Sequence, residues 1–324
     1  MDNMILVNKL YKNYKNIEAV KGINFSVKEG MFFAFLGENG AGKSTTINII
    51  ATLIKKTSGE VIVNNNYIDK EDDKIKQDIG IVFQGNVLDK YLTIRENIIT
   101  RGTLYGLTKE EINHSMLELS EKLGIINILD RSYGNLSGGQ KRRADIIRAL
   151  INKPKILILD EPTNGLDPSA RKIVWKTIKQ LRNEQNLTIF LTTHYMEEAA
   201  KADYIVIIDS GKIKATGTPE QLKMRYTSDK LILTFKKRKD IFKIMKKIGF
   251  DFIQEKEHIV IYIKNSFEAL EIIEKVKELI NDFEIIHGNM DDVFINITRK
   301  KSNEEVNINE QNMDSYKKKF NTLL

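Results

Sequence analysis

Short runs of apolar residues alternate with longer amphipathic stretches along the first two thirds of this chain. Buried strands are predicted at 31–36, 79–83, 156–159, 188–192 and 204–208, and helices at 43–53, 109–123 and 169–183. Strands that alternate with helices in this way predict an α/β fold with a parallel sheet. Residues 1–30 differ, because Ile5–Val7 and Ala19–Val27 flank a turn near 14–16 and predict a pair of strands.

The pattern pauses at 219–228, and a smaller unit is predicted after it. Its strand, helix, strand, helix, strand and short helix are expected at 230–235, 239–248, 258–264, 266–280, 283–287 and 290–297. We therefore expect a first domain at 1–224 and a small C-terminal α+β domain at 225–298. Residues 299–324 are rich in Lys, Asn and Glu and poor in apolar residues, so this tail is expected to be disordered.

A glycine-rich turn links the strand at 31–36 to the helix that follows. It comprises Gly37, Glu38, Asn39, Gly40, Ala41, Gly42, Lys43 and Ser44, with Thr45 next, and it matches G-x-x-x-x-G-K-[ST]. Glycines let backbone N–H groups surround phosphates, and the helix N-terminus adds a favourable dipole. Lys43 is expected to reach the β- and γ-phosphates of a nucleotide, and Ser44 to ligate Mg²⁺. This loop alone fits kinases, GTPases and many ATPases.

Two adjacent carboxylates follow the predicted strand at 156–159. Asp160 can hold Mg²⁺, and Glu161 can orient or deprotonate an attacking water. An isolated Asp-Glu pair at a strand end is more often two solvated carboxylates. Because this pair follows a phosphate-binding loop in the same chain, a role in catalysis is the favoured interpretation.

A second anion site is predicted where Ser137, Gly138, Gly139 and Gln140 open a helical pattern that continues to Leu150. With Leu136 before them these residues read LSGGQ, which resembles the signature of ABC ATPases. The resemblance covers about residues 4–222, and every other motif of that family is present in the expected order.

Four single residues take their expected roles from this resemblance. Tyr14 lies 23 residues before Gly37, where the family places an aromatic side chain that stacks on adenine, although it could be an ordinary tyrosine at a strand end. Gln84, at a predicted strand end, resembles the glutamine of the Q-loop, beside Mg²⁺ and the γ-phosphate. Asp167 resembles the D-loop aspartate of the nucleotide site, and His194 the switch histidine.

The resemblance also implies a fold and a working arrangement. The fold would be a parallel-sheet core with an antiparallel β subdomain and a helical subdomain. Two such domains, from two copies of this chain or from this chain and a paralogue, would pair head to tail. ATP on the loop at 37–44 of one would then be closed by Ser137–Gly139 of the other. Glu161 would act as catalytic base or water-orienting group, and His194 would hold the γ-phosphate and Glu161 in register.

Four further segments resemble the drug- and antibiotic-efflux branch of the family, whose type member confers daunorubicin resistance. They are 92–97, 104–107, 192–199 and 290–294. In that branch the membrane permease is a separate polypeptide, and export is favoured. The resemblance implies that residues 84–106 would contact the permease. The last segment could equally be a helix that only packs on its own small domain. The cargo itself is not specified by this chain.

The composition of the chain indicates the cellular compartment and excludes some kinds of chemistry. No apolar run approaches the roughly 18 residues of a membrane span, and the N-terminus lacks the apolar core of a secretory signal. We therefore expect a cytoplasmic protein that reaches the membrane through its partner. The absence of cysteine excludes disulfides, thiolate zinc sites and cysteine nucleophiles.

Two functions other than transport are compatible with parts of the sequence. The net charge of +7 is compatible with an ABC ATPase that acts on nucleic acid or ribosomes. Such relatives carry a coiled coil, cysteine zinc modules or two ATPase halves, all absent here, so no nucleic-acid partner is expected. An inactive regulatory subunit is the other alternative, and the presence of Lys43, Asp160, Glu161 and His194 argues against it.

Overall fold

The computed structural model describes residues 3–236, 249–255 and 258–298 of the 324-residue chain. The described residues divide into two compact units, with the boundary between Leu222 and Lys223, and each is described by itself. Within the described ranges, no helix combines the length and the apolar character needed to cross a lipid bilayer.

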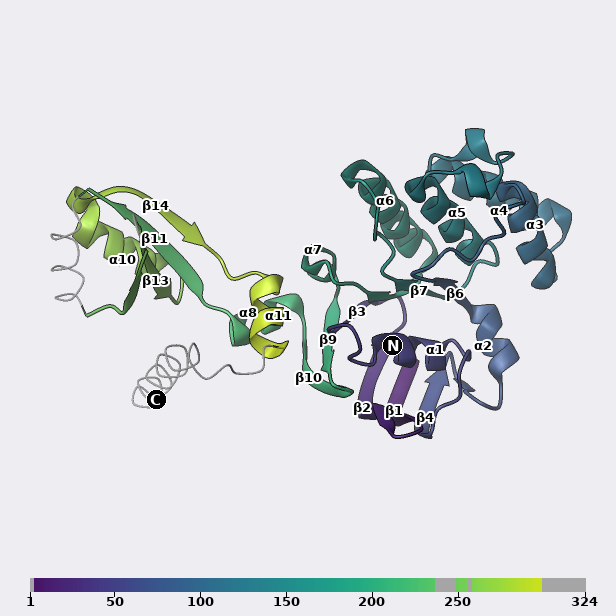
Figure 1. Ribbon diagram of the computed structural model, residues 1–324, viewed down its shortest axis with the longest axis horizontal. Helices are drawn as coiled ribbons and strands as arrows, with labels where there is room; N and C mark the ends of the chain where they lie inside the picture. The colour runs from purple at the N-terminus through teal and green to yellow at the C-terminus, as the bar shows by residue number, and fades with distance from the viewer. Residues whose placement is uncertain (1–2, 237–248, 256–257, 299–324) are drawn as a thin grey trace. The chain divides into compact units, whose positions relative to one another are not determined.

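A six-stranded sheet forms the centre of the first unit, with the strand order β10-β9-β3-β8-β7-β6 (Figure 1). Its strands are β3 (Phe32–Leu36), β6 (Ile79–Val82), β7 (Ile156–Asp160), β8 (Thr188–Thr192), β9 (Tyr204–Asp209) and β10 (Lys212–Gly217). The strands from β9 to β6 run parallel, and β10 pairs antiparallel with β9 at the edge. The carboxyl ends of β3, β6, β7 and β8 therefore share one edge, where open α/β sheets bind ligands.

An antiparallel sheet of order β2-β1-β4-β5 shares a hydrophobic core with the central sheet. Its strands are β1 (Asn3–Tyr14), β2 (Ile17–Lys28), β4 (Ser58–Val63) and β5 (Asn66–Tyr67). Ile5 of β1 is buried in one cluster with Phe33 and Phe35 of β3. Helix α1 (Lys43–Ile50) contributes Ile47 to the same cluster. The helix that follows the glycine-rich turn is therefore packed against the hydrophobic core.

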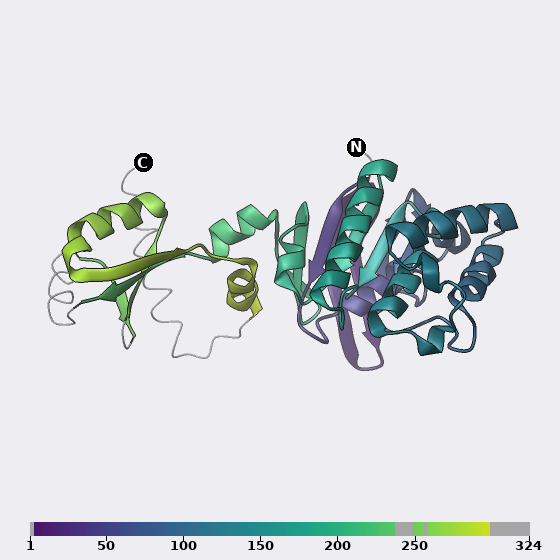
Figure 2. The same ribbon diagram turned by 90° about the horizontal axis from the view of Figure 1, so that it is seen from above.

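Three helices pack together next to β6 and β7 (Figures 1 and 2): α3 (Ile94–Leu104), α4 (Lys109–Lys122) and α5 (Gly138–Leu150). Each begins with a capping box, in which a Ser or Thr and the Glu or Gln three residues later bond reciprocally to the backbone. The remaining helices of this unit are α2 (Asp72–Asp78), α6 (Pro168–Gln185) and α7 (Met196–Ala199), with 3₁₀ turns at Ile126–Ile128 and Tyr133–Asn135. Helix α8 (Pro219–Tyr226) spans the boundary between the units.

The second unit is an antiparallel sheet covered by a helix. Its described elements are β11 (Asp229–Phe235), β12 (Phe252–Gln254), β13 (His258–Ile263), α10 (Ser266–Val276), β14 (Ile280–Ile286) and α11 (Met290–Thr298). The strand order is β12-β13-β11-β14. Leu231, Leu233 and Ile261 of the sheet are buried with Ile272 of α10 in a separate core.

The α/β class, the parallel strands and the opening strand pair are confirmed. The helix expected at 43–53 is shorter and ends at Ile50, because Thr52 takes a left-handed φ of 58°. The helix expected at 266–280 ends at Val276, and a 3₁₀ turn leads from it into β14, which begins at Ile280. The helix expected at 239–248 and the tail at 299–324 lie outside the described residues. The pattern was expected to pause at 219–228, but helix α8 occupies most of this segment. The other elements that were not expected are β4, β5, β10, β12, α2, α3 and α7.

Candidate functional site

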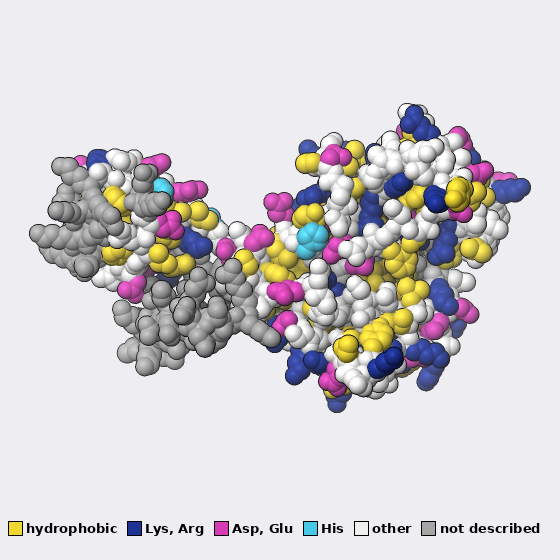
Figure 3. Space-filling view, in the orientation of Figure 1, with side chains coloured by type: hydrophobic (Ala, Val, Ile, Leu, Met, Phe, Trp, Pro, Cys, Tyr) yellow, Lys and Arg dark blue, Asp and Glu magenta, His cyan; other side chains and the backbone are white. Residues whose placement is uncertain are grey.

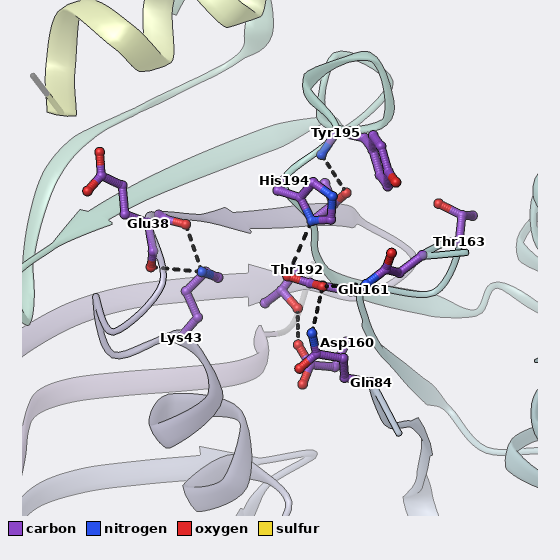
Figure 4. A network of polar contacts seen from close by, with 12 residues as sticks. Glu38, Lys43, Gln84, Asp160, Glu161, Thr163, Thr192, His194 and Tyr195 are labelled. Carbon is purple, nitrogen blue, oxygen red and sulfur yellow. Dashed lines mark hydrogen bonds and ion pairs between the residues drawn. The ribbon is translucent and has the colours of Figure 1, made fainter. Parts of the chain in front are cut away.

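The predicted site residues on the central sheet come from loops at its carboxyl edge. Lys43 is the first residue of α1, directly after the loop that follows β3, and the ends of β6, β7 and β8 carry the others. Figure 4 shows Lys43 on one side of this region and, facing it, Gln84, Asp160, Glu161 and His194. Residues separated by up to 151 positions in the sequence thus meet at one place, as expected where parallel strands end together.

The glycine-rich loop folds around the side chain of Lys43. This lysine is 8% exposed, and its Nζ donates hydrogen bonds to the carbonyl oxygens of Gly37 at 2.7 Å and Glu38 at 3.0 Å. Gly42 has a left-handed φ of 108°, and a Cβ here would lie 2.7 Å from the carbonyl oxygen of Ala19. Only glycine therefore fits this position. Of the other loop residues, Ala41 is buried, Thr45 is half-buried, and Asn39, Gly40 and Ser44 are exposed.

Burial lowers the pKa of Lys43, whereas the nearby carboxylates of Glu161 and Asp160 act to raise it. A cation that has lost part of its hydration gains more from an anionic ligand than one in open water does. The loop consequently offers a nucleotide's phosphates both backbone N–H groups and a positive charge.

Asp160 ends β7 and is fixed by the neighbouring strand. The hydroxyl of Thr192, the last residue of β8, donates to Asp160 Oδ1 at 2.5 Å. One carboxylate oxygen is thereby held in place at the sheet edge. Within the described residues, no group of three or more His, Cys, Asp or Glu side chains could hold a metal by itself.

Glu161 is the most constrained residue of the site. Its backbone is left-handed, with φ 49°, and its N–H donates to the carbonyl oxygen of Thr192 at 3.0 Å. Gln84 Nε2 donates to Oε2 of its carboxylate at 2.9 Å, and Asn164 Nδ2 donates to the same oxygen at 3.4 Å. His194 Nδ1 lies 3.4 Å from Oε1. Three neighbouring side chains thus orient the carboxylate of Glu161. The residue as a whole is only 8% exposed.

The signature residues lie at the start of α5, beside the N-terminus of α6. The Ser137 side chain accepts from the Gln140 N–H at 3.3 Å, and Gln140 Oε1 accepts from the Ser137 N–H at 3.0 Å. A Cβ added to Gly139 would meet Ala170 at 3.6 Å and Asp167 Oδ2 at 4.0 Å. The described contacts of Ser137–Gln140 are therefore with α5 and α6 and not with the glycine-rich loop of the same chain. Gly138 is exposed, and nothing lies within 4 Å of a Cβ added there.

Asp167 is the N-cap of α6. Its Oδ1 accepts hydrogen bonds at 3.0 Å from the N–H groups of Ser169 and Ala170, and these bonds, that from Ala170 most of all, lower its pKa. The predicted D-loop aspartate is thus anchored by its own helix, on the same surface as the signature glycines.

Tyr14 ends β1 and stays apart from the hydrogen-bonded group of Figure 4. Its ring is accessible, since the residue is 43% exposed, and Lys12 Nζ lies 4.7 Å from the ring centroid. An exposed ring at a strand end can stack on a planar base, which is what the predicted adenine contact requires.

Sequence reasoning missed a buried carboxylate behind His194. Glu198, in α7, is 2% exposed; its Oε2 accepts from the Thr193 hydroxyl at 2.8 Å, and its Oε1 accepts from Trp175 Nε1 at 2.9 Å and from the Thr163 hydroxyl. Thr163 follows Glu161 by two positions, and Thr193 directly precedes His194. The hydrogen bonds of Glu198 therefore connect the loop after β7 with the loop after β8. Glu198 lies in the segment 192–199 that resembles the drug-efflux branch, but no local pattern distinguishes this buried glutamate from its exposed neighbour Glu197.

Comparison with known proteins agrees with this geometry. A protein-family model described as "ABC transporter" matches residues 20–164 of this chain. The linearmycin resistance ATP-binding protein of Bacillus subtilis is 44% identical over 230 residues, which cover 71% of this chain and 74% of that protein. The daunorubicin/doxorubicin resistance ATP-binding protein of Streptomyces peucetius is 37% identical over 225 residues, 69% of this chain and 68% of that protein. A solved dimeric ATP-binding cassette bound to ADP and Pi is 32% identical with a TM-score of 0.62, and the match covers 66% of this chain and 98% of that one.

Proposed function

This chain belongs to the ABC transporter family as an ATP-binding and ATP-hydrolysing subunit, and from that premise we propose how its residues perform the reaction and what the reaction drives. The observation that carries the proposal is the carboxylate of Glu161. It is nearly buried, held by Gln84 at 2.9 Å and His194 at 3.4 Å, and it lies opposite the cation of Lys43. A carboxylate fixed in this way can orient a water for attack on a phosphate bound at Lys43.

Binding of ATP comes first. The backbone N–H groups of residues 37–45 and the N-terminus of α1 would surround the β- and γ-phosphates, with Lys43 exchanging its carbonyl contacts for phosphate oxygens. The exposed ring of Tyr14 would stack on the adenine. In the reaction Glu161 acts as catalytic base or water-orienting group, and His194 contacts the γ-phosphate and keeps Glu161 in position.

Mg²⁺ fits this site by the chemistry of its donors. Asp160, Ser44 and Gln84 offer carboxylate, hydroxyl and amide oxygens, and the Thr192 hydroxyl already fixes Asp160. Mg²⁺ prefers such oxygen ligands and commonly uses only one or two carboxylates together with phosphate oxygens and water. When bound, Mg²⁺ supplies charge neutralisation on the phosphates.

The active form is a head-to-tail dimer in which Ser137–Gly139 of one copy contact the ATP held by the other. Support comes from the dimeric cassette that matches this chain and from the geometry of the signature. The exposed start of α5 carries no acidic residue in its first turn and has no described contact with the glycine-rich loop of its own chain. Its N-terminal dipole therefore suits a phosphate from a second copy.

A groove of about 800 Å³ is proposed to receive a cytoplasmic segment of a separate membrane permease. Its apolar lining includes Leu53, Val87 and Leu104, which are 53%, 47% and 75% exposed, and its polar lining includes Asp89 and Arg101. The groove begins at Phe83, next to Gln84 of the hydrolytic site, so a change there can reach the permease. The chain would thus work at the cytoplasmic face of the membrane.

The cargo class is proposed from relatives alone. Two of them are named for resistance to linearmycin and to daunorubicin or doxorubicin, and others for Nod factor export. We therefore propose export of a drug- or antibiotic-like compound or a lipid-like molecule.

The test is steady-state hydrolysis of MgATP by the purified chain. Glu161→Gln keeps the shape of the side chain but removes its charge, and turnover is expected to fall by about 10²–10⁴-fold. Glu197→Gln, an exposed glutamate in α7, is the matched control and should leave turnover unchanged. Removal of Mg²⁺ by EDTA should abolish hydrolysis. Wild-type activity retained by Glu161→Gln would refute the assignment.

A further inference from the structure

Arg142 connects the signature helix to the hydrolytic site of its own chain. It lies in the second turn of α5, five residues after Ser137, and is 7% exposed. Its guanidinium donates to backbone carbonyl oxygens at the ends of two strands. The acceptors are Phe83 after β6, Asp160 at 2.9 Å, Glu161 at 2.6 Å and Pro162 at 2.6 Å.

These carbonyls belong to the backbone next to Gln84 and Glu161, whose side chains form a hydrogen bond of 2.9 Å in the site. Phe83 directly precedes Gln84, and the other three acceptors surround the strained backbone of Glu161. A left-handed conformation at a non-glycine residue costs on the order of 1–3 kcal/mol and persists only where neighbours hold it. Thr192 holds the Glu161 N–H from β8, and Arg142 holds its carbonyl oxygen from α5.

Keeping a cation at this position is costly. Burial lowers the pKa of Arg142, with Asp145 and Asp160 acting in the opposite direction. A well-packed apolar side chain would avoid that desolvation penalty. The rigid fork of a guanidinium, however, can reach both strand ends at once, which neither an apolar residue nor the single nitrogen of a lysine can do.

The neighbouring arginine has a different task. Arg143 donates to the carbonyl oxygens of Gly139, Leu123 and Gly124, so it fastens α5 to the end of α4. Arg142 is the one whose described hydrogen bonds reach the strand ends at the hydrolytic site.

We propose that Arg142 is a positioning residue that makes the geometry of Gln84 and Glu161 depend on the position of the signature helix. The inference rests on the proposed dimer: when Ser137–Gly139 engage the ATP of the second copy, α5 is held in place, and Arg142 passes this on to the chain's own hydrolytic site. Contact with one ATP would thus set the geometry for hydrolysis of the other.

The experiment separates turnover from binding in the full-length chain. Arg142→Lys and Arg142→Gln are compared with Arg182→Gln, a matched arginine of α6 that donates to the Gly30 carbonyl oxygen and to Asp203. For both Arg142 variants we expect kcat to fall by about 10–100-fold while KM for MgATP changes less than about threefold, because the phosphate loop is untouched. Arg182→Gln should leave both constants unchanged.

Dimerisation provides the second readout. In a Glu161→Gln background, Arg142→Lys should still form the dimer with MgATP, because Ser137–Gly139 remain intact. Unchanged kcat in a folded Arg142→Lys variant would overturn this inference but leave the proposed function standing. A parallel loss of ATP binding and turnover would do the same. If Arg142→Gln fails to fold, Arg142→Lys decides by the same criteria. A wild-type chain that neither hydrolyses MgATP nor dimerises with it in the Glu161→Gln form would contradict the proposed function and the inference with it.

Discussion

Glu161 concentrates several constraints in one residue. It combines a left-handed backbone, a nearly buried carboxylate and hydrogen-bonding neighbours from the ends of β6 and β7. Strain of this kind is common where a side chain must be held ready for chemistry. Because these contacts already fix its carboxylate, little reorganisation of Glu161 is needed during the reaction.

Glu198 should matter both for stability and for the position of His194. Glu198→Ala leaves the donors of Thr163, Thr193 and Trp175 without their acceptor, and each unpaired buried donor costs about 1–3 kcal/mol. We expect a lower free energy of unfolding in urea and a fall in kcat of more than about tenfold, since the loop that carries His194 is released. The adjacent Glu197 is exposed, so Glu197→Ala should change neither the free energy of unfolding nor kcat. A Glu198→Ala chain with wild-type turnover would contradict this role.

At the scale of elements, capping chemistry gives the helical part of the first unit a defined acid response. Glu96 and Glu111 accept backbone N–H bonds from Thr93 and Thr108, and these bonds lower the pKa of both carboxyl groups below their ordinary value. A lowered folded-state pKa means that the stabilisation is present above the unfolded-state pKa near 4.5 and is lost as the pH falls through the folded values.

The double variant Glu96→Gln, Glu111→Gln tests this response. Glutamine keeps the capping hydrogen bonds but does not titrate. The melting temperature of the variant should therefore fall less between pH 7 and about pH 3.5 than that of the wild type. Equal falls would show that these caps do not contribute to acid sensitivity. Glu110→Gln with Glu121→Gln, both exposed in α4, serves as the control.

The elements that could be predicted from the sequence are those with a strong local signal. The strand at 156–159 is a continuous apolar run, and that at 188–192 has an apolar centre between two threonines. The glycine-rich loop and LSGGQ are short sequence motifs whose residue types indicate phosphate binding. Strand β4 opens with three exposed residues and β10 alternates imperfectly, so neither has a clear period. Arg142 and Glu198 could not have been singled out, because their acceptors and donors lie up to 59 and 35 positions away.

Over the whole molecule, the charge pattern bears on the choice of partner. On the face seen in Figure 3, basic side chains in blue and acidic ones in magenta are interspersed over the first unit. A nucleic-acid site instead gathers Lys and Arg on one face or along a helix. The apolar groove next to Gln84 is a more specific surface, and it favours a protein partner.

The groove makes a testable claim about coupling. Leu104→Glu places a charge on its apolar lining and should abolish transport in a complex with the permease, while MgATP hydrolysis by the isolated chain stays within about twofold of wild type. Leu117→Glu is the control, since Leu117 is also exposed, at 44%, but lies on α4 outside the groove. Normal transport by the Leu104→Glu complex would exclude the groove as the docking surface.

We propose that two copies of this chain enclose ATP between the loop at 37–45 of one and Ser137–Gly139 of the other. Light scattering of purified Glu161→Gln protein, with and without MgATP, tests it most directly, because the variant binds ATP but is expected not to hydrolyse it. If ATP is enclosed in this way, the protein forms a dimer only with MgATP, and it stays a monomer when Lys43→Ala is added. A monomer in saturating MgATP, or a dimer that forms regardless of nucleotide, would contradict it.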